Sequence, residues 1–167
     1  MDLYDYSIAP LIRNLQNLRH LLQLGEAYAA QKNVAAEVVL NSRLAVDMYP
    51  LIKQVQLVSD MSKGAGARLS GRSMPVYADD EDSFDTLYAR IDKTITFLQS
   101  ISASELAGAE NKEVVLTIRK VDLTFTGQDY LQKWVMPNVY FHVTTAYNIL
   151  RQLGAPLGKT DYLGQKR

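Results

Sequence analysis

Apolar residues recur every three or four positions in four long stretches of the chain, a pattern that predicts amphipathic helices. The predicted helices span residues 7–31, 48–71, 83–100 and 127–153. In the first, one apolar stripe runs through Leu11, Leu15, Leu18 and Leu22. His20 falls on the opposite, polar side of that helix, where we expect it to be exposed.

Capping and breaking residues set the expected ends of these helices. Asp47 is expected to be the N-cap of the second helix, because Pro50 suits the first turn that would follow. Either Asp82 or Ser83 is expected to cap the third helix. Pro137 lies inside the last stretch, so we predict a kink or break there before the helix restarts.

Between the third and last helices the apolar pattern changes to a period of two. Residues 114–118 and 123–126 alternate apolar and polar positions, and residues 119–122 are expected to form the turn between them. An isolated hairpin is marginal in water, so it should pack on the helices. We therefore predict an all-α, four-helix bundle with one short β-hairpin, forming a single domain over residues 1–167.

Composition narrows the function classes without naming one. Eighteen basic and eighteen acidic residues balance in a chain of 167, which gives no global attraction to nucleic acid or to an anionic membrane. There is no cysteine, so thiolate catalysis, disulfides and cysteine zinc sites are excluded. The acidic start and the lack of a long apolar run lead us to expect a cytoplasmic protein with no membrane or nucleic-acid partner.

Two groups of charged and polar residues do not match a known site motif. The first is expected to be a solvated helix face, and the second lies in a loop where calcium is an alternative, although the EF-hand spacing is absent. Gln56, Asp60 and Lys63 share one face of the second helix. The acidic run over residues 79–82 precedes the third helix, where negative charge suits the helix dipole.

His142 is the candidate catalytic residue. It falls on the apolar stripe of the last helix and should point into the bundle, where an imidazole needs partners for its ring nitrogens. It is either a hydrogen-bonded core residue or part of a site. The positions three and four residues later hold Thr145 and Ala146, which do not complete a transition-metal site.

Three further residues are candidates for a ligand pocket around His142. Gln54 lies at the core edge of the second helix, and Asp47 lies two turns earlier on the same line, so both could face one cavity. Asp47 also has its capping role as an alternative. Tyr147 belongs to a tyrosine-rich stripe of the last helix, which could line a pocket rim or serve as packing or dimer surface.

Several longer motifs carry a resemblance to a known family. They are residues 41–51, residues 54–56, residues 59–60, Phe125-Thr-Gly127, residues 137–147 and residues 156–163. Together they resemble a bacterial family of unknown function within the DinB/YfiT-like superfamily of proposed metalloenzymes, nearly from end to end. The resemblance implies the superfamily's four-helix bundle and a homodimer.

The resemblance also implies a metal site that this chain does not complete. DinB-like sites use one histidine on the second helix and a pair spaced by four on the last. His142 matches the first of the pair, whereas Ala146 and Gln54 stand at the other two positions. We therefore expect a degenerate site with no cofactor and an unknown small molecule bound near His142. The alternatives are a divalent-metal enzyme, of hydrolase or thiol-transferase type, rebuilt from His142 and Asp47, and a non-catalytic dimeric structural protein.

Overall fold

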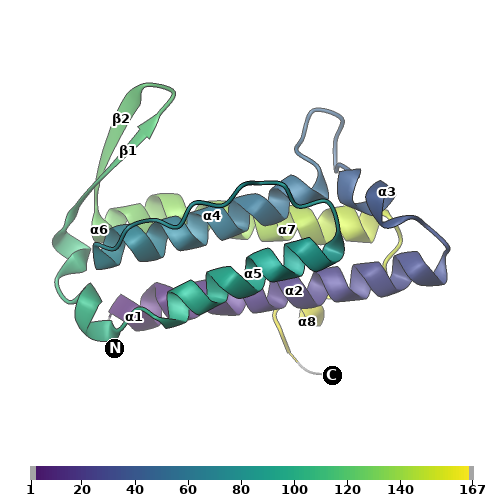
Figure 1. The fold of residues 1–167 in the computed structure, drawn as a ribbon, viewed down its shortest axis with the longest axis horizontal. Coiled ribbons are helices and arrows are strands. Elements are labelled where there is room, and N and C mark those ends of the chain that lie inside the picture. The colour runs from purple at the N-terminus through teal and green to yellow at the C-terminus, as the bar shows by residue number, and fades with distance from the viewer. Residues whose placement is uncertain (1–2, 166–167) are drawn as a thin grey trace.

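Four long helices lie side by side along the molecule in the computed structural model, which describes residues 3–165 (Figure 1). They are α2 (Ile8–Gln31), α4 (Leu51–Ser70), α5 (Phe84–Gln99) and α7 (Met136–Gln152). Short helices α1 (Leu3–Tyr6), α3 (Ala36–Asn41) and α8 (Lys159–Tyr162) cover the ends and one side. Between α5 and α7 the chain forms 3-10 turns η1 (Ala103–Leu106) and η2 (Ala109–Asn111), strands β1 (Glu113–Ile118) and β2 (Val121–Thr126), helix α6 (Gly127–Asp129) and segment η3 (Tyr130–Val135).

The core lies where the apolar stripes of the four helices meet. The stripe of α2 predicted from the sequence is fully buried, and it faces Val55 and Val58 of α4, Ile91 of α5 and Ile149 of α7 in one apolar cluster. His20 is exposed, as predicted. Each fully buried leucine stabilises the fold by about 1.5–3 kcal/mol relative to an exposed one, so the spacing of apolar residues accounts for the bundle.

The start of α4 differs from the prediction. Asp47 does not cap it, because the helix begins at Leu51 and its N-cap is Pro50, with no side-chain cap. The backbone N–H of Leu51 instead donates to the carbonyl of Ser42, 2.9 Å away. The helix start is thus fixed by backbone pairing, and Asp47 lies in an exposed turn between α3 and α4.

The start of α5 follows the prediction. The hydroxyl of Ser83 accepts from the backbone N–H of Thr86, and the Thr86 side chain caps back onto Ser83. Before it, segment 72–82 is a loop, and it returns along α4 in extended form to reach α5 (Figure 1).

The last helix is not broken at Pro137. Thr126 caps the start of α6, and the chain continues without interruption through η3 into α7. Segment η3 is a π-helix. This wider turn directly precedes Pro137, which lies in the first turn of α7 and has no amide hydrogen to donate.

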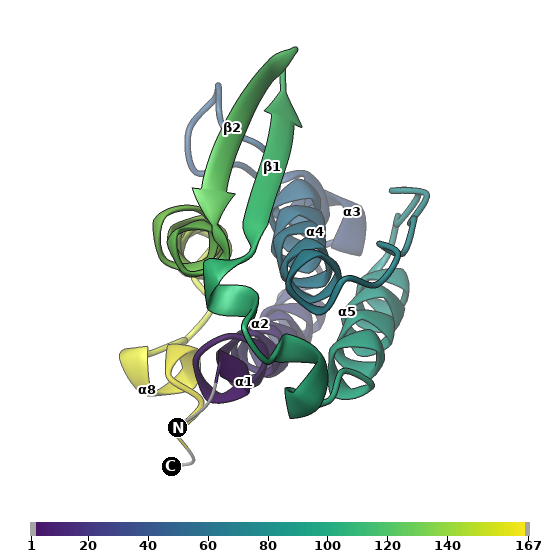
Figure 2. The ribbon, with the colours of Figure 1, turned by 90° about the vertical axis from the view of Figure 1, so that its left-hand side faces the viewer.

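The hairpin is present where predicted, with a tighter turn. Ile118 pairs with Val121, so the turn is Arg119-Lys120 rather than residues 119–122. Both residues have positive φ, at 49° and 68°, as a two-residue hairpin turn requires. Val114 and Leu116 anchor the hairpin in the core, and its tip projects from the same side of the bundle as turn 42–50 (Figures 1 and 2).

The C-terminal segment lies against α2. The Asn17 side chain donates to the carbonyl of Tyr162, and Arg13 donates to that of Leu163, both at 3.0 Å. None of the helices within residues 3–165 combines the length and apolar content needed to cross a membrane.

Candidate functional site at the junction of α4 and α7

His142 is buried on the face of α7 that packs against α4, as its place on the apolar stripe predicts. Its exposed fraction is 8%, and its helix neighbours Val139 and Ala146 are fully buried. The neighbouring Phe141 is exposed, and the two rings meet edge to face with centroids 5.2 Å apart. His142 therefore lies at the outer edge of the junction between the two helices, close to solvent.

Gln54 and His142 are brought together across this junction, 88 residues apart in the chain. Gln54 Nε2 donates to the carbonyl of Tyr49 at 2.9 Å, and Gln54 Oε1 lies 2.7 Å from His142 Nδ1. The carbonyl of Tyr49 can only accept, so the amide of Gln54 must direct its NH2 group there and its oxygen toward the ring. Nδ1 must then carry the proton and donate it to Gln54.

This hydrogen bond leaves His142 Nε2 as an unprotonated acceptor. Nε2 has no hydrogen-bond partner among residues 3–165, and it is not one of the fully buried nitrogens, so it is open to solvent. Burial lowers the pKa of His142 below its ordinary value of 6.5, which keeps the ring neutral at pH 7. The junction thus presents a neutral imidazole in a fixed tautomer with one lone pair available.

The other two pocket candidates do not join this pair. Asp47 is exposed and makes no hydrogen bond or ion pair with any residue in the range 3–165. Tyr147 packs partly against the core, and its ring meets Tyr162 of α8 edge to face, with centroids 6.1 Å apart. The structure therefore unites two of the four candidates.

The residues at the junction do not fit the metal that the resemblance implies. Gln54 Oε1 and His142 Nδ1 are joined by a hydrogen bond of 2.7 Å, so His142 Nε2 is the one ligand atom left at the junction, and a tetrahedral site needs further ligands beside it. At the third position Ala146 offers a methyl group packed in the core. No group of three histidine, aspartate or glutamate side chains able to hold a metal occurs in residues 3–165.

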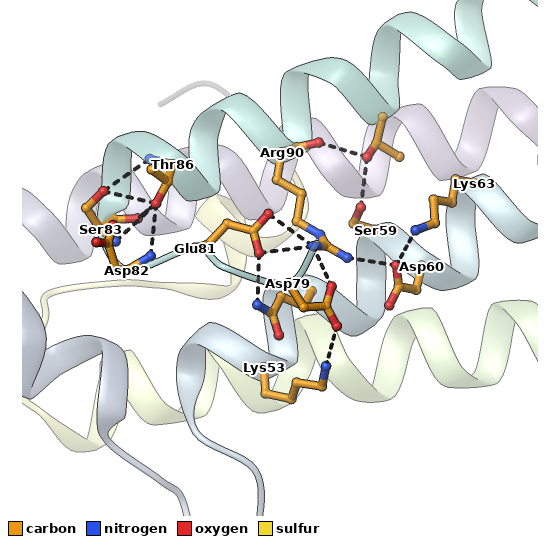
Figure 3. Close-up of polar contacts among 12 residues, drawn as sticks. Lys53, Ser59, Asp60, Lys63, Asp79, Glu81, Asp82, Ser83, Thr86 and Arg90 are labelled. Carbon is orange, nitrogen blue, oxygen red and sulfur yellow. Dashed lines mark hydrogen bonds and ion pairs between the residues drawn. The ribbon is translucent and has the colours of Figure 1, made fainter. Parts of the chain in front are cut away.

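A second polar cluster, which the sequence analysis does not predict, lies on the opposite face of α4 (Figure 3). Arg90 of α5 is fully buried and contacts three carboxylates: Glu81 at 3.0 Å, Asp79 at 2.7 Å and Asp60 at 2.7 Å. The remaining members of the cluster are Gln56, which donates to Glu81, Lys53, which pairs with Asp79, and Lys63, which pairs with Asp60.

This cluster corrects the expectation that the polar face of α4 is solvated. Gln56 and Lys63 are buried, because segment 72–82 covers them and supplies Asp79 and Glu81. A signal was present in the sequence: Arg90 lies three residues after Leu87 and therefore at the edge of the buried face of α5, where a charge must find a partner.

The cluster is close to neutral as a whole. Burial opposes ionisation of Glu81, but hydrogen bonds from Gln56 and Arg90 outweigh burial and lower its pKa. Lys53 and Arg90 lower the pKa of Asp79. Three carboxylates face three cations, and their ion pairs hold segment 72–82 on the bundle. Among the buried side-chain nitrogens and oxygens of residues 3–165, only Arg90 Nε has no hydrogen-bond partner.

Cavities are found away from His142. One of about 750 Å³ lies at the end of the bundle, between α1, the turns η1 and η2, and segment η3. Another of about 380 Å³ lies between α2, Tyr140 of α7 and the C-terminal segment. His142 lines neither of these two cavities.

The fold and the junction together define a DinB-like helical bundle without the histidine set of a metal site. The chain belongs to a domain family of unknown function (DUF1993), whose model matches residues 3–163. It is also similar to a DinB family member protein from Shewanella denitrificans, known from a crystal structure, with 38% identity and a TM-score of 0.92. The match covers 98% of this chain and 93% of that one. A search of curated proteins finds no match.

Proposed function

We propose that the chain binds a small molecule at His142 without a metal ion. The hydrogen bond between His142 Nδ1 and Gln54 Oε1 is the observation that carries this proposal, because it fixes the tautomer in which Nε2 is an acceptor. A ligand with an O–H or N–H group would donate to Nε2. Any catalysis would use the same atom as a general base, since the lowered pKa keeps the ring neutral.

Binding can be tested with the two histidines of the chain as reporters. Protein labelled in its histidine rings gives signals from His142 and His20 alone. We expect fragments with a phenol or amide donor to shift the His142 ring signals and to leave those of exposed His20 unchanged. His142→Gln should abolish binding, whereas the control His20→Gln should retain it. Binding that survives in His142→Gln would contradict the proposal.

A metal-dependent enzyme is the alternative that the superfamily suggests. Elemental analysis of untagged protein after incubation with zinc, nickel or manganese separates the two hypotheses. Our proposal predicts no stoichiometric metal in the wild type or in His142→Gln. A metal retained at one per chain in the wild type and lost in the variant would contradict the proposal and revive the metalloenzyme.

A non-catalytic, dimeric role is the third candidate, and the exposed apolar residues beside the junction favour it. Phe141 and Tyr49 flank the His142–Gln54 pair in the chain, with exposed fractions of 56% and 58%. Light scattering with size-exclusion chromatography measures the mass of the particle. A dimer that Phe141→Ser converts to monomer, together with no fragment that shifts His142, would favour the structural role over ligand binding.

A further inference from the structure

Arg68 has a guanidinium with few protein partners, near the end of α4. Its Nη1 lies 3.3 Å from the hydroxyl of Tyr130 and 3.9 Å from the sulfur of Met74, both weak contacts. It forms no ion pair with any residue from 3 to 165. Nε and Nη2 have no hydrogen-bond partner there and are not fully buried, so they are open to a ligand.

A glycine in α4 makes room for this guanidinium. A Cβ atom at Gly64 would lie 2.5 Å from Arg68 Nη1, which means that the side chain folds back along the helix into space that any other residue would fill. Glycine is unfavourable in a helix interior compared with alanine. The position of the guanidinium therefore depends on a residue that is otherwise a poor choice for this helix.

Two neighbouring cavities meet at Arg68. One, of about 320 Å³, lies between α4 and segment 74–79 and is lined by Met74 and Tyr77. The other, of about 160 Å³, lies between α4, β1 and η3 and is lined by Tyr130 and Trp134. Arg68 lines both cavities, and so do two other residues of α4. A molecule in the second cavity can therefore place one end at the Arg68 guanidinium.

The charges around the cavities leave Arg68 as an unbalanced cation. Asp60 also lines both cavities, but its carboxylate already binds Arg90 and Lys63 at 2.7 Å each. Burial raises the pKa of Tyr130, so its hydroxyl stays protonated. That hydroxyl accepts a hydrogen bond from Arg68, and its own proton is free to be donated to a bound anion.

We propose that this groove binds an aromatic monocarboxylate, with its carboxylate on Arg68 and its ring against Trp134. A guanidinium pairs with a carboxylate through two parallel hydrogen bonds, and one free cation matches one negative charge. A cavity of roughly 150 Å³ is large enough to hold a benzene ring. The cavity beside Trp134 has about this volume, and its lining is partly aromatic.

The groove is independent of the His142 site. Gln54 and Arg68 are separated by fourteen positions on α4, a rise of about 21 Å along the helix axis, so one small molecule does not contact both. Ligand binding at Arg68 can therefore be tested independently of ligand binding at His142.

Trp134 is the only tryptophan of the chain, so its fluorescence reports on the groove directly. The full-length protein is titrated with benzoate, and with benzamide as the uncharged analogue. We expect a saturable change with benzoate at millimolar or lower concentration, about ten- to a hundredfold weaker binding in Arg68→Gln, and little binding of benzamide. Arg19→Gln is the matched control, since Arg19 pairs with Asp92 on the surface, and it should bind as the wild type does.

Gly64→Ala provides a second test that keeps the arginine. It should weaken benzoate binding by displacing the guanidinium, while circular dichroism confirms that the bundle remains folded. Equal benzoate affinities in the wild type and Arg68→Gln would overturn the proposal. So would the absence of a saturable fluorescence change, or equal binding of benzamide and benzoate.

Discussion

Gln54 and Gln56 are two residues apart on α4, and each takes part in a different polar site. One site is a neutral hydrogen-bonded pair, and the other is a cluster of charged side chains. Gln54 and Gln56 point about 200° apart around the helix, toward α7 and toward α5 respectively. Gln54 accepts from a neutral histidine, whereas Gln56 donates to Glu81 in a cluster of six charged groups. Gln54 and His142 are both buried, whereas the charged cluster extends from buried Arg90 and Glu81 to partly exposed Asp60, Asp79 and Lys53.

The difference shows what each site can do. Around Arg90 nearly every polar atom is paired, because an uncompensated buried charge costs several kcal/mol, and such a closed network fixes structure. The His142–Gln54 pair carries no net charge, so one nitrogen can stay open at modest cost. We infer that the charged cluster holds segment 72–82 in place and that the neutral pair is the part available to a ligand.

The largest expected effect comes from breaking the charged cluster. Arg90→Leu removes the cation that neutralises buried Glu81, and it should lower the free energy of unfolding by about 3–5 kcal/mol in urea titrations. Arg19→Leu removes a surface pair with Asp92 and should cost less than about 1 kcal/mol. Similar losses in the two variants would contradict the structural role assigned to the cluster.

A smaller effect is expected from the neutral pair, and it should be recoverable. His142→Leu leaves Gln54 Oε1 without its donor and should cost about 1–3 kcal/mol in the same titrations. The double variant Gln54→Leu with His142→Leu removes both partners and should regain most of that loss. If the two single costs simply add, the hydrogen bond between these residues does not exist in solution.

The two sites should also differ in their dependence on pH. Because burial lowers the pKa of His142, the unfolded chain binds a proton near pH 6.5 while the folded chain resists it. Stability should therefore fall as pH drops below about 6.5 in the wild type, and less so in His142→Gln, as measured by thermal melts from pH 8 to pH 5. Parallel curves for the two proteins would mean that the His142 ring is not shielded from protonation.

The charged cluster responds in a more acidic range. Glu81 and Asp79 have pKa values lowered below their ordinary 4.5 and 3.8, so the stability they contribute is present above these values. It should be lost as pH falls through the lowered values of the folded chain. In melts below pH 4.5 the double variant Arg90→Leu with Glu81→Leu should lose less stability than the wild type.

The smallest effect is expected at Asp47. It is exposed and without a partner in the described chain, so Asp47→Ala should change stability by less than about 0.5 kcal/mol. It should also leave the ring signals of His142 unchanged in NMR spectra. A shift of those signals would bring Asp47 back into the site.

Features that depend on neighbours in the chain could be predicted, and those that depend on distant partners could not. The leucine stripe of α2 and the Ser83 cap are local patterns, and both are present. The contact between Gln54 and His142 agrees with the prediction that the core edge of one helix and the apolar stripe of the other face one site. The predicted start of α4, with Asp47 as its cap, was wrong, because the observed start depends on a hydrogen bond from the backbone N–H of Leu51 to the carbonyl of Ser42.

The Arg90 cluster shows the other limit. Its carboxylates come from α4 and from a loop without periodicity, so no spacing in the sequence connects them to α5. The continuity of the last helix was missed for a similar reason. The effect of Pro137 depends on the wider turn of η3 before it, and that turn has no sequence pattern of its own.

Nitrogen-15 NMR of the histidine ring at neutral pH measures the tautomer of His142, on which ligand binding at Nε2 depends. We expect a neutral ring with the proton on Nδ1 and an unprotonated Nε2, and a shift toward mixed tautomers in Gln54→Leu. A ring in the wild type with its proton on Nε2, or a charged ring at pH 7, would contradict this expectation.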